Sequence, residues 1–213
     1  MRVVVFGASG ATGQQLIQQG LARRLEITAF VRNPKKVQAR DHLRVITGDV
    51  YNIEDVASAI AGQDAVFSAL GARTLAKNNL LERAMVNILQ GMNRHGVKRL
   101  IVLGAGGSLG REQALRHQSF LTRRMYAFFV DKLLKNPMDS QRAQEELIIA
   151  SNTDFTIVQP PRLTNGHATG KYRVAADAFP PHMKATPRAD VADFMLRQLE
   201  DRDWIRKMPF LCL

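Results

Sequence analysis

A length of 213 residues, with 46% hydrophobic and 23% charged residues, is enough for one sizeable core and is ordinary for a globular domain. No apolar run approaches the roughly 18 residues that cross a bilayer, and the opening MRVVVFG reaches its glycine too early for a signal peptide. We therefore expect no membrane span and a cytoplasmic location. The single cysteine, Cys212, excludes an internal disulfide framework and a cysteine cluster for zinc.

The formal net charge of +11 is compatible with nucleic acid or with a smaller polyanion as a partner. The lysines and arginines are spread along the chain, and neither zinc-finger spacing nor an aromatic RNA-binding signature is present. We therefore expect a small anionic cofactor or substrate rather than nucleic acid. The histidines at positions 42, 95, 117, 167 and 182 show no metal-ligand spacing, so no metal site is expected.

Short β-branched runs alternate with longer segments of helical period along the whole chain. This pattern predicts an α/β fold, a doubly wound Rossmann-type and mainly parallel sheet with helices on both faces, in a single domain over residues 1–213. The predicted strands are Arg2 to Phe6, Glu26 to Val31, Leu43 to Thr47, Ala65 to Ala69, Arg99 to Leu103 and Phe155 to Val158. The predicted helices are Thr12 to Arg23, Ile53 to Ile60, Asn78 to His95, Ser140 to Ser151 and Arg188 to Leu199.

The first strand leads directly into the glycine loop GASGATG, which opens the first helix. Gly7 allows a tight turn, Gly10 lets the backbone approach a pyrophosphate, and Gly13 permits close packing of helix on strand. Free N–H groups at the start of the helix would then bind the phosphates. The loop predicts a dinucleotide site that includes Gly7, Ser9, Gly10, Ala11, Thr12 and Gly13.

The second strand ends in VRNPKK, where a dinucleotide-binding protein contacts the adenosine ribose. An acid at this place would select NAD, but the sequence places Arg32 there, followed by Lys35 and Lys36. Because an arginine fork suits a 2′-phosphate, we expect NADP(H) to be preferred over NAD(H). The alternative is that these charges only form a solvated turn around Pro34.

The least regular part of the chain is Gly104 to Lys135, where a glycine-rich turn leads into a basic segment with aromatic residues. Segments at about 104–135 and 160–187 are expected to elaborate an acceptor site. For RRMYAFFVDKLLK, core packing or a subunit contact is favoured over a membrane-surface helix, because the segment is short and lies between elements of one domain. Whether the chain is a monomer or a homodimer stays open.

With these residues in view, the chain resembles an atypical member of the short-chain dehydrogenase/reductase superfamily, in the NAD(P)H-binding group that includes biliverdin-IXβ reductase/flavin reductase and the NmrA-like proteins. The resemblance rests on GASGATG at 7–13, VRNP at 31–34, GDV at 48–50, AGQDAVFSALGAR at 61–73, HGVKRLIVLGA at 95–105, TDFTIVQPPRLTNG at 153–166 and RADVADFML at 188–196. It implies that Asp49 and Val50 contact adenine and that Leu70 and Gly71 pass under the ribose and phosphates. Gly104 and Ala105 are also expected to contact the cofactor.

The chain departs from this superfamily at the catalytic positions. Typical members use a Tyr-x-x-x-Lys pair, but Tyr126 is followed four positions later by Val130, and the later segment SQRAQEELIIAS offers Gln144, Glu145 and Glu146 rather than lysine. The serine that usually follows the fifth strand is replaced by a run of small residues, Gly104 to Gly107, and only then comes Ser108. Alcohol or ketone chemistry with the usual pair is therefore not expected.

Hydride transfer to a conjugated acceptor depends mainly on position and on the cofactor, so solvent is expected to supply the proton. The small glycines are expected to leave room for a planar acceptor, with flavin as an acceptor rather than a tightly bound group. The substrate-binding candidates are Gly106, Ser108, Pro161 and Arg162, and the catalytic candidates are Ser108 as a hydrogen-bond donor and Tyr126 as an acid. Ser108 could instead cap the next helix, Tyr126 could be a packed aromatic, and Arg162 could form a surface ion pair.

Three functions follow from this reading. The leading one is NADPH-dependent reduction of a flavin, a quinone or another planar conjugated small molecule. The second is an NmrA-like sensor or assembly protein that binds NADP(H) without turnover, which the missing Tyr-x-x-x-Lys pair favours equally. The third is an isomerase or epimerase, which would need a proton-transfer group that the sequence does not identify.

Overall fold

The computed structural model describes residues 1–71, 76 and 78–213, so the last two residues of the AGQDAVFSALGAR motif, Ala72 and Arg73, lie outside the described residues. Six parallel strands form the central sheet in the order β3-β2-β1-β4-β5-β6. They are β1 (Arg2–Phe6), β2 (Glu26–Val31), β3 (Leu43–Thr47), β4 (Ala65–Ser68), β5 (Arg99–Leu103) and β6 (Asp154–Val158). This is the strand order of a Rossmann fold, and the predicted fold class is confirmed.

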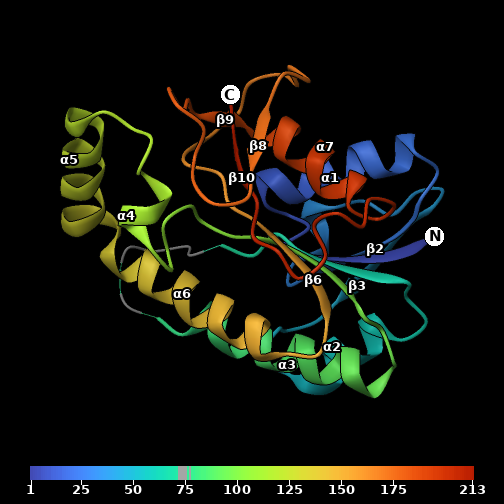
Figure 1. Cartoon of the computed structure of the whole chain (residues 1–213). Coiled ribbons are helices and arrows are strands. Elements are labelled where there is room, and N and C mark those ends of the chain that lie inside the picture. The colour runs from blue at the N-terminus through green and yellow to red at the C-terminus, as the bar shows by residue number, and fades with distance from the viewer. Residues whose placement is uncertain (72–75, 77) are drawn as a thin grey trace.

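Helices cover both faces of the sheet (Figure 1). One face carries α1 (Ala11–Ala22) and α7 (Arg188–Arg197), and the other carries α2 (Ile53–Ile60), α3 (Leu80–Arg94) and α6 (Lys135–Ala150). The strands are apolar because each face is buried: Val3 and Val5 pack into the core beneath α1 and α7, whereas Val4 and Phe6 pack into the core on the opposite face. Alternate side chains of a strand point to opposite faces, so one run of apolar residues serves two cores.

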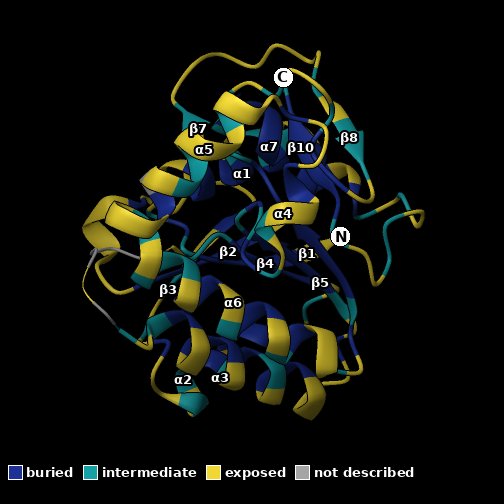
Figure 2. Cartoon of the chain, turned by 60° about the vertical axis from the view of Figure 1, so that its left-hand side comes forward, coloured by how far each residue is buried: buried dark blue, intermediate teal, exposed yellow. Residues whose placement is uncertain are grey.

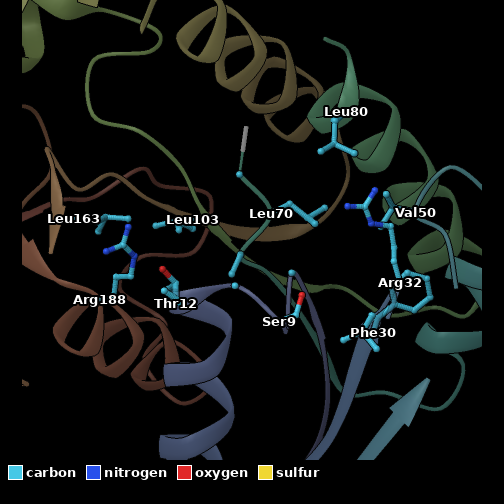
Figure 3. A pocket seen from close by; sticks show the side chains of 16 residues that line it. Ser9, Thr12, Phe30, Arg32, Val50, Leu70, Leu80, Leu103, Leu163 and Arg188 are labelled. Carbon is cyan, nitrogen blue, oxygen red and sulfur yellow. The ribbon is translucent and has the colours of Figure 1, made fainter. Parts of the chain in front are cut away.

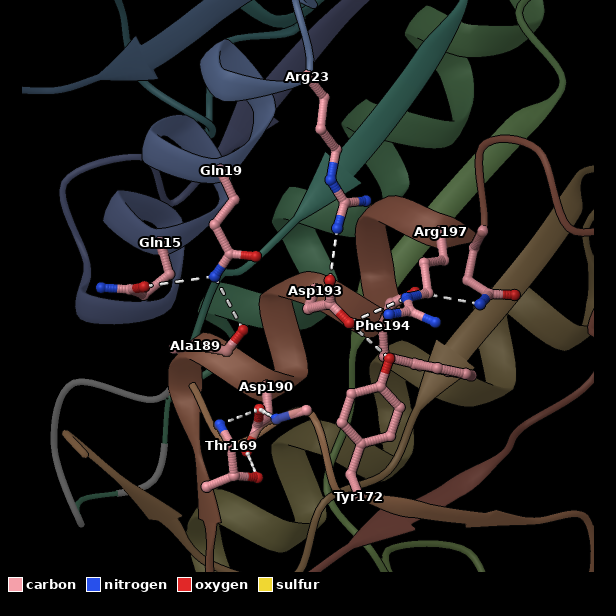
Figure 4. Close-up of polar contacts among 12 residues, drawn as sticks. Gln15, Gln19, Arg23, Thr169, Tyr172, Ala189, Asp190, Asp193, Phe194 and Arg197 are labelled. Atoms are coloured by element: carbon pink, nitrogen blue, oxygen red, sulfur yellow. Dashed lines mark hydrogen bonds and ion pairs between the residues drawn. The ribbon is translucent and has the colours of Figure 1, made fainter. Parts of the chain in front are cut away.

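Helix α7 is fastened to its neighbours by the two aspartates of the RADVADFML motif (Figure 4). Asp193 forms an ion pair with Arg23 of α1 and accepts a hydrogen bond from the Tyr172 hydroxyl at 2.6 Å. Asp190 is fully buried and accepts hydrogen bonds from Thr169 N at 2.8 Å and Thr169 Oγ1 at 2.7 Å. The motif therefore ties α1 and the segment that follows β6 to one helix.

The strands and helices predicted from the sequence end within two residues of the observed bounds, except that α6 begins at Lys135 rather than at Ser140. The early start includes Pro137, which lies in the first turn of α6, where proline removes no intrahelical hydrogen bond. In the described part of the chain, no helix is long and apolar enough to cross a membrane.

Between β5 and α6, the irregular segment forms α4 (Arg111–Ala114), α5 (Phe120–Phe129) and a π-helical turn (Val130–Leu134). Helix α5 stands away from the sheet and is largely exposed (Figures 1 and 2). Four large apolar side chains, Phe120, Leu121, Met125 and Phe128, are each at least 64% exposed.

Four short strands were not expected from the sequence, because two or three residues carry too little periodicity to be recognised. Strand β7 (Leu163–Thr164) pairs in parallel with β9 (Thr186–Pro187), and β8 (Arg173–Ala175) pairs antiparallel with β10 (Phe210–Cys212). The segment leading into β10 also runs along β6, with hydrogen bonds from Arg206 N to Phe155 O at 2.7 Å and from Ile157 N to Lys207 O at 3.1 Å.

Candidate functional site

A cleft of about 300 Å³ opens at the carboxyl ends of the strands, where the strand order reverses between β1 and β4 (Figure 3). Open α/β sheets bind their ligands at this switch point. Segments from both halves of the chain form the walls: Gly7, Ser9, Gly10, Ala11, Thr12, Phe30, Val31, Arg32, Val50, Ala69, Leu70, Gly71, Leu80, Leu103, Leu163 and Arg188.

The glycine loop is shaped by contacts between backbone atoms. Gly7 has a φ of +79°, and a Cβ at this position would lie 2.5 Å from Ala69 O. A Cβ at Gly13 would lie 2.2 Å from Gly7 O, so only glycine lets α1 approach β1 this closely. Both positions require glycine for packing, and Gly13 does not itself line the cleft.

Gly10 has a different environment from Gly7 and Gly13. Gly10 is the N-cap of α1 and has an ordinary extended backbone. A Cβ placed at this position would contact only Gly7 O, at 3.2 Å. The first hydrogen bond inside α1 runs from Gln14 N to Gly10 O at 2.9 Å. The N–H groups of Ala11, Thr12 and Gly13 precede it and lie outside the helical hydrogen-bond ladder. A Gly10 side chain would enter the cradle in which a bound anion would meet these N–H groups.

Arg32 follows β2 and lines the cleft, with its guanidinium beside Val50 in Figure 3. Lys35 and Lys36 do not line the cleft and are exposed. They belong to a short 3-10 helix (Pro34–Lys36) in which the Asn33 side chain accepts a hydrogen bond from Lys35 N at 3.0 Å. The alternative interpretation, that these charges form a solvated turn around Pro34, therefore holds for Lys35 and Lys36. Arg32 instead faces the cleft.

The other residues expected at the cofactor end separate into two groups. Val50, Leu70 and Gly71 line the cleft, and the Val50 side chain is buried. Asp49 is exposed and does not line the cleft, because its carboxylate accepts a hydrogen bond from Tyr51 N at 3.0 Å and so turns back onto its own loop.

Two glycines of the turn after β5, Gly104 and Gly106, face side chains from other parts of the chain. A Cβ at Gly104 would lie 2.6 Å from both Glu145 Oε1 and Ile157 Cγ2, and a Cβ at Gly106 would lie 2.1 Å from Phe179 Cζ. Side chains of the protein fill the direction that a side chain would take at each glycine. A Cβ at Gly107 would meet only ordinary contacts, the nearest with Arg111 Cα at 3.5 Å, so room for an acceptor beside this turn stays a prediction.

Tyr126 projects from α5 toward this turn, and its hydroxyl donates a hydrogen bond to Gly106 O at 2.7 Å. Burial raises the pKa of the Tyr126 phenol, and nearby Arg111 opposes the rise. Tyr126 packs against the cluster of Ala114, Leu115 and Phe179. The neutral phenol of Tyr126 thus holds the turn by a hydrogen bond. This arrangement matches the packed aromatic residue that was the alternative to an acid.

Ser108 lies at the end of the same turn and meets a carboxylate that the sequence did not single out. The Ser108 hydroxyl faces Ala105 O at 2.9 Å and also hydrogen bonds to Glu145 Oε2, while Ala105 N donates to Glu145 Oε1 at 3.3 Å. Gly110, not Ser108, is the N-cap of α4. Burial raises the pKa of Glu145 to about 7, against the opposing effect of hydrogen bonds from Ser108, Ala105 and Gln159.

At the other wall, the structure brings Arg188 rather than Arg162 to the cleft. Arg162 is exposed, and its carbonyl accepts from Thr186 N at 2.8 Å, while the adjacent Pro161 is half-buried. Arg188 begins α7, lies near Leu163 and Thr12 in Figure 3, and donates to Asn165 Oδ1 at 2.7 Å. The RADVADFML motif begins with this arginine, so the motif contained a signal that the sequence reading did not use.

A second hollow of about 590 Å³ is lined by the last residues of the turn, Gly107 and Ser108. Its walls come from the turn, α4, the π-helical turn and α6: Gly107, Ser108, Leu109, Gly110, Arg111, Glu112, Gln113, Val130, Asp131, Lys135, Met138, Asp139 and Arg142. The segment from Leu103 to Ser108 thus contributes residues to both the cleft and this hollow. Within residues 1–71, 76 and 78–213, no group of three or more His, Cys, Asp or Glu residues could hold a metal ion.

Comparison with known sequences gives a family match over residues 7–202, to the NAD(P)H-binding family. The uncharacterized protein YwnB of Bacillus subtilis is 27% identical over 205 residues, which are 94% of this chain and 92% of YwnB. The Photosystem II assembly factor Ycf39 of Synechocystis is 24% identical over 167 residues, which are 75% of this chain but only 44% of Ycf39.

Three solved structures share the fold over nearly their whole length. The oxidoreductase ylbE from Lactococcus lactis has a TM-score of 0.81 at 23% identity, with 100% of this chain and 90% of ylbE covered. ChuY, an anaerobillin reductase from Escherichia coli O157:H7, has a TM-score of 0.80 at 21% identity, with 100% and 97% covered. A short-chain dehydrogenase/reductase from Veillonella parvula in complex with NADP has a TM-score of 0.80 at 18% identity, with 100% and 94% covered.

The family match confirms the resemblance inferred from the motifs, and it begins at Gly7, the first residue of the glycine loop. The loop, the N-terminus of α1 and the cleft at the switch point are the features that such a family requires. The chain is a Rossmann-fold member of the NAD(P)H-binding family.

Proposed function

We propose that the chain is an NADPH-dependent reductase that transfers hydride to a flavin, a quinone or another planar conjugated acceptor. The observation that carries this proposal is the course of the cleft, which runs from Arg32 at the end of β2 to Leu103 at the end of β5. In a Rossmann fold the first of these places holds the adenosine ribose. The second is where the dinucleotide, when bound, supplies hydride to an acceptor.

The preference for NADPH rests on Arg32. A guanidinium presents several N–H donors that match phosphate oxygens, and no acid stands at the end of β2 to accept from a ribose hydroxyl. The Veillonella parvula structure with the same fold was solved with NADP, which is consistent with this reading.

The residues of the chain would share the work of binding and orientation. The loop from Gly7 to Gly13 and the N-terminus of α1 would hold the pyrophosphate. Leu70, Leu103 and Leu163 give the cleft apolar walls that would exclude water from the reacting ring. The absence of a Tyr-x-x-x-Lys pair favours an acceptor that needs positioning more than it needs an activated tyrosine.

The cofactor assignment is tested by Gly10→Val. Because Gly10 has φ −80° and ψ 164°, valine fits its backbone, and the side chain should enter only the phosphate cradle. We expect a folded protein whose Kd for NADPH rises at least about 10²-fold, as measured by fluorescence titration, because the pyrophosphate contacts are lost. Retained micromolar binding by the folded variant would count against this site.

The reaction is tested by following NADPH oxidation by the wild-type protein with FMN, riboflavin, a set of quinones and biliverdin. The proposed reductase function predicts turnover with at least one of these acceptors. The Gly10→Val variant is the matched control, because it should not bind NADPH and should therefore show no turnover. ChuY, which shares the fold, is a reductase by name, and this supports the choice of reaction class.

An assembly protein without turnover is the second candidate, and the exposed face of α5 favours it. Phe120, Leu121, Met125 and Phe128 form an apolar stripe that a protein partner could cover. Ycf39 is an assembly factor by name. NADPH binding by the wild-type protein, together with no oxidation by any acceptor in the panel, would select this function over the reductase.

A further inference from the structure

The fully buried carboxyl group of Glu145 faces the turn after β5, which directly follows the cleft residue Leu103. It belongs to a stripe of buried polar side chains on α6, together with Ser140, Gln141 and Gln144. Placing a carboxylate in the interior is costly unless it is paired or can take up a proton. The partners of Glu145 are uncharged: Ser108 Oγ, Ala105 N and the Gln159 side chain.

The contacts of Ser108 allow this network to exist in two protonation states without movement of a heavy atom. When Glu145 is ionised, the Ser108 hydroxyl donates its proton to Glu145 Oε2. When Glu145 is protonated, its O–H can donate to Ser108 Oγ, and the serine hydroxyl then donates to Ala105 O, 2.9 Å away. Each polar atom has a partner in both states. A proton can therefore be held on the carboxyl group or passed to the serine oxygen.

We propose that Glu145 and Ser108 form a proton-delivering pair, in which Ser108 passes its hydroxyl proton to the reduced acceptor and Glu145 replaces it. The proposal rests on the reductase function proposed above. Ser108 would be the catalytic residue, since it is the member of the pair that lines the second hollow, where the acceptor would lie, and Glu145 would act through it. This pair takes the place of the solvent protonation expected from the sequence.

The step balances in atoms and charge. NADPH, held by the loop from Gly7 to Gly13 when bound, would supply a hydride, which is two electrons and one proton, to one atom of the acceptor as a C–H bond of its nicotinamide breaks. A second atom of the acceptor then gains the proton of Ser108 Oγ, which Glu145 Oε2 restores. Glu145 regains a proton from water, so the sum is NADPH, acceptor and one proton giving NADP⁺ and the reduced acceptor.

The surroundings of Glu145 determine the pH at which such a pair works. Burial raises the pKa of Glu145 to about 7, so half of the molecules would hold the proton near neutral pH. From α5, the titratable side chain of Tyr126 approaches the turn, and its hydroxyl donates a hydrogen bond to Gly106 O. On α6 itself, Arg142 pairs with Glu146, and Lys135 pairs with Asp139.

The neighbouring elements add charged groups only at a distance from the pair. On α3, which packs against α6, Glu82, Arg83 and Arg94 are exposed. On β6, Asp154 lies at the opposite end of the strand from Gln159. In the second hollow, Arg111 pairs with Asp131 at 2.7 Å and Lys135 pairs with Asp139 at 3.1 Å. The protonation of Glu145 is therefore governed by burial and neutral hydrogen bonds.

Glu145→Gln is the decisive variant, with Glu146→Gln as its matched control on the exposed side of the same helix. Glutamine keeps an acceptor for Ala105 N and a donor for Ser108 Oγ, so a purely structural role predicts no change. We expect kcat to fall about 10²-fold with the NADPH Kd within about twofold of wild type, because a lost proton donor typically costs this much. Ser108→Ala should lower kcat similarly, and Ser108→Thr, which keeps the hydroxyl, should restore part of it.

The pH dependence of kcat and an infrared measurement test the Glu145–Ser108 pair in two ways, during turnover and in the protein without substrate. In the wild type, kcat should be highest below pH 7 and fall about tenfold per pH unit above it, because delivery needs protonated Glu145. This inflection should vanish in Glu145→Gln and persist in Glu146→Gln. In the free wild-type protein, the infrared C=O stretching band of a protonated carboxyl group should titrate near pH 7. This band should be missing from Glu145→Gln and present in Glu146→Gln.

The outcomes distinguish the two proposals. No turnover by the wild-type protein with any acceptor would overturn the reductase function and the delivery step with it. Turnover by the wild type with an unchanged kcat and pH profile in Glu145→Gln would overturn the pair alone. Absence of the titrating band from the wild type would also overturn the pair, because Glu145 would then hold no proton to deliver.

Discussion

The two ends of the cleft use glycine for different reasons. At the phosphate end, the space that a Cβ would need at Gly7 and Gly13 is filled by backbone atoms, Ala69 O and Gly7 O. In the turn that follows the cleft residue Leu103, the same space at Gly104 and Gly106 is filled by side chains from elsewhere, Glu145, Ile157 and Phe179. Backbone that directly follows two paired strands, β1 and β4, cannot easily move aside, whereas a side chain can be replaced. The phosphate end is therefore fixed by the fold, and the other end is open to change by substitution.

The largest effect is expected from Gly13→Val, which tests the backbone-filled end. A Cβ would lie 2.2 Å from Gly7 O and 2.8 Å from Ala8 Cα, and neither atom can shift without separating α1 from β1. We expect destabilisation of about 3 kcal/mol or more, or no folded protein, by thermal unfolding followed by circular dichroism. Gly71→Ala is the control, because a Cβ there would meet no atom within 4 Å. Equal stability of the two variants would contradict the comparison.

A smaller effect is expected from Gly106→Leu, at the end filled by side chains. The new side chain would collide with the Phe179 ring, so we expect a loss of about 1–3 kcal/mol in the free energy of unfolding and reduced turnover, with the NADPH Kd nearly unchanged. Because the obstacle is a side chain, Gly106→Leu with Phe179→Ala should be more stable than the sum of the two single losses predicts. Strict additivity in a double-mutant cycle would show that Phe179 is not the obstacle.

Arg32→Ala tests selectivity at the phosphate end. Loss of a charge-assisted contact to a 2′-phosphate should raise the Kd for NADPH by about tenfold to 10²-fold, and the Kd for NADH much less. Lys35→Ala is a matched control, since this lysine does not line the cleft. Isothermal titration with both cofactors measures the effect, and equal losses for NADPH and NADH would remove the role from Arg32.

The smallest effect is expected from Tyr126→Phe. The substitution removes one hydrogen bond to Gly106 O and leaves the ring in place, so stability should fall by about 0.5–1.5 kcal/mol. If Tyr126 only fixes the turn, acceptor reduction should stay within about tenfold of wild type. A loss beyond about 10²-fold with folding and NADPH binding preserved would make Tyr126 the acid.

The sheet and the strand-loop-helix unit of the glycine loop could be predicted from the sequence because their determinants are local. Gly7, Gly10 and Gly13 lie on one strand-loop-helix unit, and the apolar strands and amphipathic helices each carry their own period. The adenine contact expected of Asp49 stays a prediction, since Asp49 Oδ1 accepts from Tyr51 N of its own loop.

The other end could not be predicted because it depends on pairs of residues far apart in the chain. Ser108 and Glu145 are 37 positions apart, and Gly106 meets Phe179 from the segment before β9. From the sequence, Glu145 is noted only because it occupies a segment that lacks the lysine of a Tyr-x-x-x-Lys pair. Its burial depends on the register of α6 against the sheet, and α6 begins five residues earlier than its periodicity indicated.

The segment that runs along β6 has a consequence for assembly. An outer strand normally exposes a row of N–H and C=O groups onto which another chain can add a strand. Here Phe155 O, Ile157 N and Gln159 N are already bonded to Arg206 N, Lys207 O and Pro209 O, respectively. The β6 edge of the sheet is thus covered by the chain itself. A second copy could extend the sheet only at the opposite edge, β3.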